Sequence, residues 1–285
     1  MNRENITLPD GRKMEYLRNG EIREQAVILH AGTTQDITGW QTWLDYFATH
    51  GVFALSFGRS GYAGSTAMPG RVTIDVANDV AELATNLGIT KFVNIGLSGG
   101  GQHAVATGLD HRSVGVVTVG SLAPFAELGD HFYTGMQQAD LDEYADALRD
   151  INDLVKRFQK WQDGDVAETV AGAQLSQRDQ LASAKPSWKV LLDSCAFTMA
   201  QGWGWVADDY SSYLKPWGFD PRDVKVPSII WQGGLDKNVP EQHGKWLATN
   251  MPNAKLEPRE SESHLGIFVN YEEEIMDSAI KLLKN

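Results

Sequence analysis

The sequence predicts an α/β protein whose mostly parallel sheet is flanked by helices and interrupted by a helical insertion. Short apolar runs rich in β-branched residues alternate with amphipathic stretches of helix length. Helices of that length between strands imply right-handed crossovers and therefore parallel pairing. The alternation stops between residues 124 and 218, where no strand is expected and acidic helical segments such as Leu141–Phe158 take over. We therefore expect a core of residues 1–123 and 219–285 and a helical cap of residues 124–218.

The individual elements follow from the same patterns. Runs dominated by apolar residues are expected to form the buried strands, namely Ala26–His30, Val52–Phe57, Phe92–Leu97, Val114–Val119 and Val226–Trp231. Helical spacing is clearest in Thr38–His50 and Thr73–Leu87, and Gly88 ends the second helix, as glycine commonly does. The opening segments Ile6–Leu8 and Lys13–Leu17, joined by Pro-Asp-Gly, are expected to pair as an antiparallel hairpin at one edge.

Composition and charge narrow the possible classes. The chain has 285 residues, of which 42% are hydrophobic and 22% charged, a composition typical of one large globular domain. A formal net charge of -12, without any Lys/Arg-rich run, argues against a nucleic-acid partner. No apolar run approaches the roughly 18 residues needed to cross a membrane, and the single cysteine, Cys195, cannot form an internal disulfide. We expect a cytoplasmic protein with a small-molecule substrate, while its oligomeric state stays open.

The segment Gly96-Leu97-Ser98-Gly99-Gly100 matches the pattern G-x-S-x-G. A predicted strand leads into this segment and a helix of small residues leads out of it, so Ser98 is expected on a sharp turn at the carboxyl end of the sheet. Glycines on both sides relieve the crowding of such a turn. The alternative is a glycine-rich turn that serves packing alone. The strand–motif–helix context favours Ser98 as a nucleophile.

A serine hydroxyl is a weak nucleophile at neutral pH and needs a base that is itself held by an acid. Asp236 follows the predicted strand Val226–Trp231 on a glycine-containing turn, which makes it the candidate acid. His264 lies in a polar segment before the last helix, where we expect an exposed imidazole, and it is the candidate base. The order serine, acid, histidine is the order of the α/β nucleophile-elbow enzymes. Of the other histidines, His103 is expected to pack or cap on its helix and His243 to lie on a solvated helix face.

Acyl transfer generates an oxyanion that needs two preorganised donors. The backbone N–H of Gly99, directly after the nucleophile, is expected to be one of them. The second is expected from the segment after the strand Ala26–His30, either from Gly32 or from Thr33. A simple glycine turn after a strand is the alternative for this segment.

Together these segments resemble the α/β-hydrolase superfamily over nearly the whole chain. Residues 98–104, with the sequence SGGGQHA, resemble the SGGGPHA segment of its esterase-like and peptidase-like members. Residues 59–65, RSGYAGS, resemble its R-P-G-Y-G-G-S loop, and the segments that end in Asp236 and His264 match its acid and histidine segments. The resemblance implies an eight-stranded type of sheet, with residues 124–218 as the variable cap. Ala31, Gly58 and Ser60 depart from the family pattern, where glycine, aspartate and proline are usual.

These predictions point to a serine hydrolase that cleaves a carboxylic ester or lactone of a small, partly apolar substrate through an acyl-serine intermediate. Phe125, Phe132, Trp203 and Trp205 are candidate pocket walls, with ordinary core packing as their alternative. No cofactor is expected, and no metal, because the sequence contains no ligand cluster with the usual spacing. Aminopeptidase-like hydrolysis, hydrolysis of a carbon–carbon bond, a cofactor-free oxygenase and a binding protein without turnover remain the alternatives.

Overall fold

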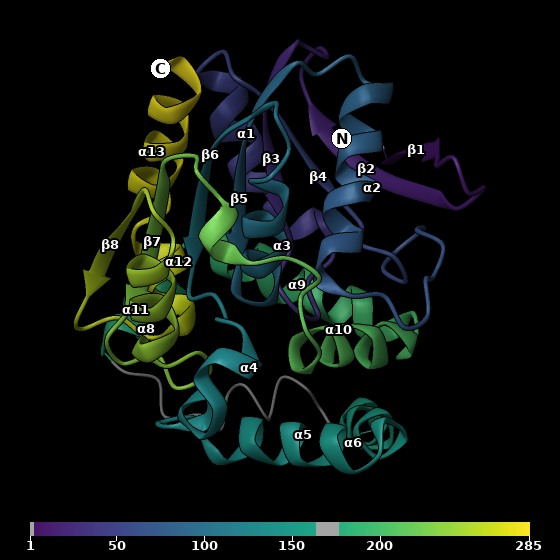
Figure 1. Ribbon diagram of the computed structural model, residues 1–285, viewed down its shortest axis with the longest axis vertical. Coiled ribbons are helices and arrows are strands. Elements are labelled where there is room, and N and C mark those ends of the chain that lie inside the picture. Colours follow the sequence, from purple (N-terminus) through teal and green to yellow (C-terminus); the bar gives the residue numbers. More distant parts are fainter. Residues whose placement is uncertain (1–2, 164–176) are drawn as a thin grey trace.

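An eight-stranded sheet runs through the computed structural model, which describes residues 3–163 and 177–285 (Figure 1). Its strands are β1 (Arg3–Thr7), β2 (Lys13–Asn19), β3 (Gln25–His30), β4 (Phe53–Phe57), β5 (Lys91–Leu97), β6 (Ser113–Val119), β7 (Ser228–Gly233) and β8 (Ala254–Arg259). They lie in the order β1-β2-β4-β3-β5-β6-β7-β8. Strand β2 pairs antiparallel with β1 and β4, and every other neighbouring pair is parallel. The mostly parallel sheet is confirmed.

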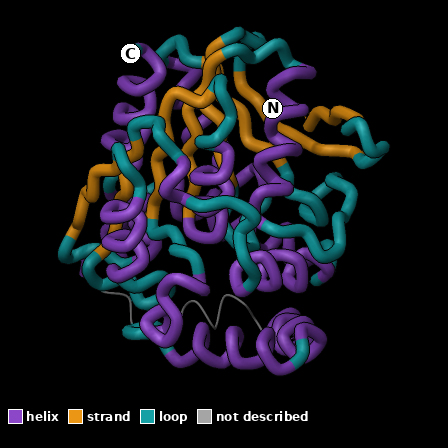
Figure 2. Tube along the Cα trace, in the orientation of Figure 1, coloured by secondary structure: helices purple, strands orange, loops and turns teal. Residues whose placement is uncertain are grey.

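Helices cover both faces of this sheet (Figure 2). The core helices are α1 (Gln41–Thr49), α2 (Thr73–Asn86), α3 (Gly101–Thr107), α11 (Glu241–Asn250), α12 (His264–Asn270) and α13 (Glu272–Lys284). Strand β3 shows how the period of two divides the core: Ala26 and Ile28 pack with the apolar side of α2, whereas Val27 and Leu29 pack with α1 and α13. The strand is buried on both faces, which is why its sequence shows a continuous apolar run.

In the part of the insertion that the structure describes, all regular secondary structure is helical. It contains α4 (Phe125–Leu128), α5 (Gln138–Arg149), α6 (Ile151–Asp163), α8 (Gln177–Ser183), α9 (Pro186–Ala200) and α10 (Gly204–Leu214), and the 3-10 turn η3 (Gly129–Tyr133). The predicted helix Leu141–Phe158 is two helices, because Asp150 between them has an extended backbone. Residues 164–176 of the predicted cap lie outside the described residues. The bounds of the cap as a unit stay a prediction.

The insertion divides between two hydrophobic clusters. Trp188 and Leu191 of α9 pack in the same cluster as Trp40 and Trp43 of the core. Helices α5, α6 and α10 instead contribute to a separate aromatic cluster, which also includes Leu122 after β6. Helices α4, α5, α6 and α10 therefore lie across the carboxyl edge of the sheet (Figure 1).

One strand was not expected from the sequence. Strand β8 contains Pro258 and has no fully buried residue, because it lies at the edge of the sheet and pairs only with β7. Proline, which lacks an N–H, is tolerated in a sheet at such an edge. Among the described helices, none is long and apolar enough to span a membrane.

Candidate active site

The sheet order places the predicted site residues in a row. Strands β3, β5, β6 and β7 are consecutive neighbours, and Leu97 pairs with Val119, which in turn pairs with Trp231. Ser98 follows β5 directly, and Asp236 follows β7 after a short turn. Because the parallel strands end at one edge, residues separated by 138 positions in the chain come to neighbouring strand ends.

Ser98 lies on a strained turn between β5 and the 3-10 turn η2 (Ser98–Gly100), which runs into α3. Its φ is +51°, a left-handed conformation that non-glycine residues rarely adopt. The turn is possible because Gly96 lacks a side chain: a Cβ there would lie 2.6 Å from the carbonyl oxygen of Gly100. Strain of this kind is typical of functional sites. The conformation is the one that the nucleophile-elbow prediction requires.

Asp236 and His264 form a hydrogen-bonded pair. His264 Nδ1 lies 2.7 Å from Asp236 Oδ2, and the other carboxylate oxygen accepts the N–H groups of Asn238 and Val239 at 2.9 and 2.8 Å. The Asp236 carboxylate is thus fixed on both oxygens and has no exposed surface. With Nδ1 occupied, Nε2 is the ring nitrogen of His264 left to act on a serine. This is the arrangement that a triad requires of its acid and base.

The surroundings of His264 differ from the sequence expectation. We expected an exposed imidazole in a loop, but His264 is the first residue of α12 and its side chain is only 12% exposed. Burial by itself lowers the pKa of the imidazole, but the carboxylates of Asp236 and Asp140 outweigh it, so the pKa is raised. Asp140, on cap helix α5, lies within 3.1 Å of Asn238 Nδ2. Burial raises the pKa of Asp140 to about 6.

Gly120, which follows β6, packs closely against the Asp–His pair. A Cβ at this position would lie 3.0 Å from both Asp236 Oδ2 and His264 Nδ1. Its φ of +54° also favours glycine. Gly120 is not among the site residues predicted from the sequence, although a glycine directly after a buried apolar strand was the available signal.

The candidate oxyanion loop, residues 31–35, lies beside Ser98. A Cβ on Gly32 would be 3.5 Å from Ser98 Cβ, so this loop is in van der Waals range of the serine. The N–H of Gly32 donates to Gln35 Oε1 at 2.8 Å, whereas the N–H of Thr33 makes no hydrogen bond to any described residue. Thr33 Oγ1 also lies beside Gly99, the other predicted donor. The geometry brings both predicted donor segments together.

Tyr213 of α10 is not among the site residues predicted from the sequence. A Cβ on Gly99 would collide with the Tyr213 hydroxyl and with Thr33 Oγ1, so the insertion places a phenol against the residue that follows Ser98. The Tyr213 hydroxyl lies 2.5 Å from Thr33 Oγ1. Tyr213 is one of several aromatic residues in α10 without a distinguishing motif, and no signal in the sequence separates it from its neighbours.

The four predicted pocket aromatics belong to the aromatic cluster of the cap. The rings of Phe125 and Phe132 lie 5.2 Å apart, and those of Trp203 and Trp205 lie 5.8 Å apart. Phe132, Trp203 and Trp205 are almost fully buried. Trp205 also packs against the core residue Tyr62 at 5.2 Å. These contacts describe cap packing, and the role of the four as pocket walls stays a prediction.

Two further histidines are buried in the core. His243 lies on the predicted helix, α11, but the expectation that it is solvated is wrong: it is fully buried. Its Nδ1 accepts the N–H of Ala123 at 3.2 Å, and its Nε2 lies 2.9 Å from the carbonyl oxygen of Phe132. Burial lowers its pKa to about 4. His103 packs inside the fold as expected, with Nδ1 3.3 Å from the carbonyl oxygen of Thr73.

An eight-stranded, mostly parallel sheet with serine, aspartate and histidine in this chain order at its carboxyl edge defines the class of the α/β hydrolases. The sequence model of the alpha/beta hydrolase family matches residues 26–276, so the chain belongs to this family. No curated protein matches the sequence. Within residues 3–163 and 177–285, no group of three His, Cys, Asp or Glu side chains is placed to hold a metal ion.

Several solved structures share the fold. A hydrolase from Pseudomonas aeruginosa PA01 is 20% identical, with a TM-score of 0.70 over 100% of this chain and 99% of that chain. An enol-lactonase from Burkholderia xenovorans LB400 is 16% identical, with a TM-score of 0.70 over 99% and 100%. An esterase from Exiguobacterium antarcticum is 18% identical, with a TM-score of 0.68 over 99% of both chains. At these identities the likeness establishes the fold, and function has to be argued from the site.

Proposed function

We propose that this protein is a serine hydrolase that cleaves a carboxylic ester or lactone of a small, partly apolar substrate. The observation that carries the proposal is the bonded pair of His264 and Asp236 at the same edge of the sheet as Ser98, which lies on its strained turn. His264 Nε2 removes the proton of Ser98, whose Oγ attacks the carbonyl carbon and forms an acyl-serine. His264 then protonates the leaving alcohol, and water releases the acid by the reverse use of the same groups.

The proposed acyl transfer also needs electrostatic support for the oxyanion. The N–H of Gly99 and an N–H of residues 31–35 supply it, since these segments meet beside Ser98. The Ser98 hydroxyl makes no hydrogen bond to any described residue. The hydrogen bond between a catalytic serine and its histidine often forms or tightens only when the substrate is bound. The catalytic roles of Ser98, Asp236, His264, Gly32, Gly99 and Thr33 rest on this reasoning.

We name an ester or lactone ahead of the other uses of a serine triad by analogy with proteins that share the fold. They include the enol-lactonase and the esterase named above. A bromoperoxidase from Bacillus anthracis shares the fold as well, at 18% identity. Aminopeptidase-like hydrolysis and carbon–carbon bond hydrolysis use the same groups, and a binding protein would keep them without turnover. A substrate panel separates these possibilities.

The test combines labelling with turnover. A fluorophosphonate probe should form an adduct that peptide mapping places on Ser98, and a panel of p-nitrophenyl esters, lactones and amino-acid arylamides should give the highest kcat/KM for an ester or lactone. Ser98→Ala should lose the adduct and lower kcat by roughly a million-fold, with an unchanged melting temperature. Ser183→Ala, which alters an exposed serine on α8, is the matched control and should behave as the wild type. An adduct elsewhere, or full activity in Ser98→Ala, contradicts the proposal.

A further inference from the structure

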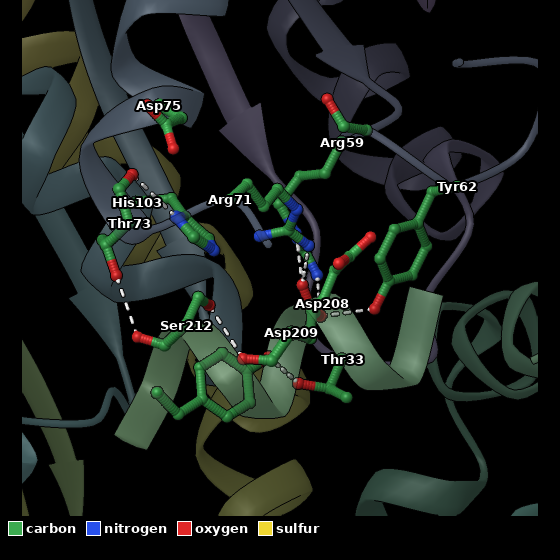
Figure 3. A network of polar contacts seen from close by, with 12 residues as sticks. Thr33, Arg59, Tyr62, Arg71, Thr73, Asp75, His103, Asp208, Asp209 and Ser212 are labelled. Carbon is green, nitrogen blue, oxygen red and sulfur yellow. Dashed lines mark hydrogen bonds and ion pairs between the residues drawn. The ribbon is translucent and has the colours of Figure 1, made fainter. Parts of the chain in front are cut away.

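A fully buried ionic cluster joins the cap to the core beside the active site. Asp209 of α10 has no exposed surface and lies between two buried guanidinium groups, those of Arg59 and Arg71 (Figure 3). Its Oδ2 accepts from Arg59 Nη2 at 2.7 Å, from the Tyr62 hydroxyl at 2.5 Å and from the Tyr213 hydroxyl at 2.9 Å. Burial raises the pKa of Asp209, but the two arginines outweigh it and hold the pKa well below its usual range. The carboxylate is therefore charged and fully hydrogen-bonded.

Arg59 also contacts the candidate oxyanion loop. Its Nη1 donates to the carbonyl oxygen of Ala31, and its Nη2 lies 3.3 Å from the carbonyl oxygen of Gly32. In a trans peptide the C=O and N–H of one unit point in opposite directions. Two carbonyls directed at one guanidinium thus direct the N–H groups of Gly32 and Thr33 away from it. Arg59 consequently fixes the orientation of both peptide units that carry a candidate oxyanion donor.

Tyr213 provides a second connection between Asp209 and the candidate oxyanion loop. Its single hydroxyl proton goes to the Asp209 carboxylate, which can only accept. The 2.5 Å contact between Tyr213 and Thr33 must then use the proton of the Thr33 hydroxyl. The Thr33 side chain is therefore a donor to the cap and not to the oxyanion. The Gly32 N–H donates to Gln35, so the backbone N–H of Thr33 is left as the donor of the two that has no partner among the described residues.

The loop itself is strained. Thr34 has a φ of +66°, which is rare for a β-branched residue, and its hydroxyl lies 3.5 Å from the sulfur of Cys195 on α9. In the described chain the non-glycine residues with positive φ are Thr34, Ala63 and Ser98, so two of the three lie at the candidate site. Strained conformations persist where the surrounding contacts hold them. Here the cap and Arg59 provide those contacts.

We propose that Asp209 is a positioning residue which, through Arg59 and Tyr213, orients the amide groups of the oxyanion loop and makes the Thr33 N–H the second oxyanion donor. The inference rests on the proposed serine hydrolase function. It means that α10 of the cap completes the catalytic machinery. An arrangement that served stability alone would leave turnover unchanged when one of its hydrogen bonds is removed.

Two phenols provide a matched pair for the test. Tyr62 and Tyr213 are both buried and both donate to Asp209 Oδ2, but only Tyr213 continues to Thr33. Tyr213→Phe should lower kcat by about tenfold or more and leave KM within about twofold, because the donor is displaced only slightly. Tyr62→Phe should lower kcat by less than about threefold, although it removes the same kind of bond.

Asp209→Asn tests the centre of the cluster, and Asp208→Asn is its control. Asp208 is the adjacent residue, but its carboxylate accepts the N–H of Gly70 and makes no contact with the oxyanion loop. Asp209→Asn should lower kcat by about 10- to 100-fold without a matching change in KM, whereas Asp208→Asn should keep the wild-type kcat. If Asp209→Asn fails to fold, the Tyr213→Phe and Tyr62→Phe pair still decides the question.

The measurements are kcat and KM on the best ester of the panel, the rate of fluorophosphonate labelling and the melting temperature. Support requires that kcat falls in Tyr213→Phe and stays closer to the wild-type value in Tyr62→Phe at similar melting temperatures. Equal kcat values for the two variants overturn the positioning role and leave a structural one. A wild-type protein that is neither labelled nor active overturns the proposed function instead, so the two failures are distinct.

Discussion

Gly120→Ala is the substitution that most directly tests the geometry of the candidate triad. The added Cβ would lie 3.0 Å from Asp236 Oδ2 and His264 Nδ1 and 3.1 Å from His264 Cε1, where ordinary contacts are 3.4 Å or longer. The Asp–His pair must therefore shift by a few tenths of an ångström. The φ of +54° adds backbone strain of about 1–2 kcal/mol, since an L-residue is disfavoured in the left-handed region.

The expected effect on turnover follows from the size of that shift. A misplacement of about 1 Å costs roughly 100-fold in rate, so a shift of a few tenths should lower kcat/KM by about five- to tenfold. The free energy of unfolding should fall by about 1–2 kcal/mol, which leaves the fold intact. The assay is ester hydrolysis under kcat/KM conditions, with urea denaturation of the same preparation.

Gly51→Ala is the matched control. Gly51 has a φ of +69° and a Cβ there would meet nothing within 4 Å, so this variant carries backbone strain without the contact. It should lose a similar amount of stability and keep the wild-type kcat/KM. If Gly120→Ala and Gly51→Ala show the same kcat/KM, the proposed support of the Asp–His pair by Gly120 is wrong.

Two further predictions concern pH. Asp140→Asn removes a carboxylate that raises the pKa of His264. Because the proposed base His264 acts only when neutral, the acidic limb of the kcat/KM profile should move to lower pH. A limb that does not move would show that Asp140 has no influence on the pKa of His264. His243 has a folded pKa of about 4 against about 6.5 in the unfolded chain, so its burial costs stability as the pH falls through that window. Between about pH 7 and pH 5 the free energy of unfolding should fall by about 2 kcal/mol from this cause. In urea denaturation, His243→Gln should remove that part of the pH dependence. An equally steep dependence in the variant would contradict the lowered pKa of His243.

The sequence contained most of the information on the core. Buried parallel strands have continuous apolar runs, and β3, β4, β5 and β6 were predicted to within a residue or two at each end. The positions of Ser98 and Asp236 just after strands were also predicted, because each follows such an apolar run directly or closely. In a parallel sheet that position determines where a residue lies in space.

The environments of the histidines could not be predicted in the same way. His264 and His243 both occur in polar stretches of sequence, yet both imidazoles are largely or fully buried. The groups that bury them, such as Phe132 of the cap against His243, are distant in the chain. The local sequence pattern indicates whether a segment forms a helix or a strand. It does not indicate which distant element will cover that segment and bury its side chains.

The ionic cluster was hidden for the same reason. Arg59 and Asp209 are separated by 150 positions, and each alone looks like an ordinary charged surface residue in the sequence. Strand β8 was not predicted for a different reason. It is an edge strand without the apolar run that its neighbours have, and it contains a proline.

The division of the insertion between two clusters has a practical consequence for exchanging substrate preference among α/β hydrolases. Helix α9 shares its apolar contacts with Trp40 and Trp43, so replacing it removes part of the core of the acceptor protein. Helix α10 carries Asp209, which forms a buried ion pair with Arg59 of the core. An acceptor protein that receives α10 therefore also needs an arginine at the position of Arg59. A chimera that swaps α5 and α6 alone leaves both of these contacts in place, and we expect it to fold where an exchange of the entire insertion would not.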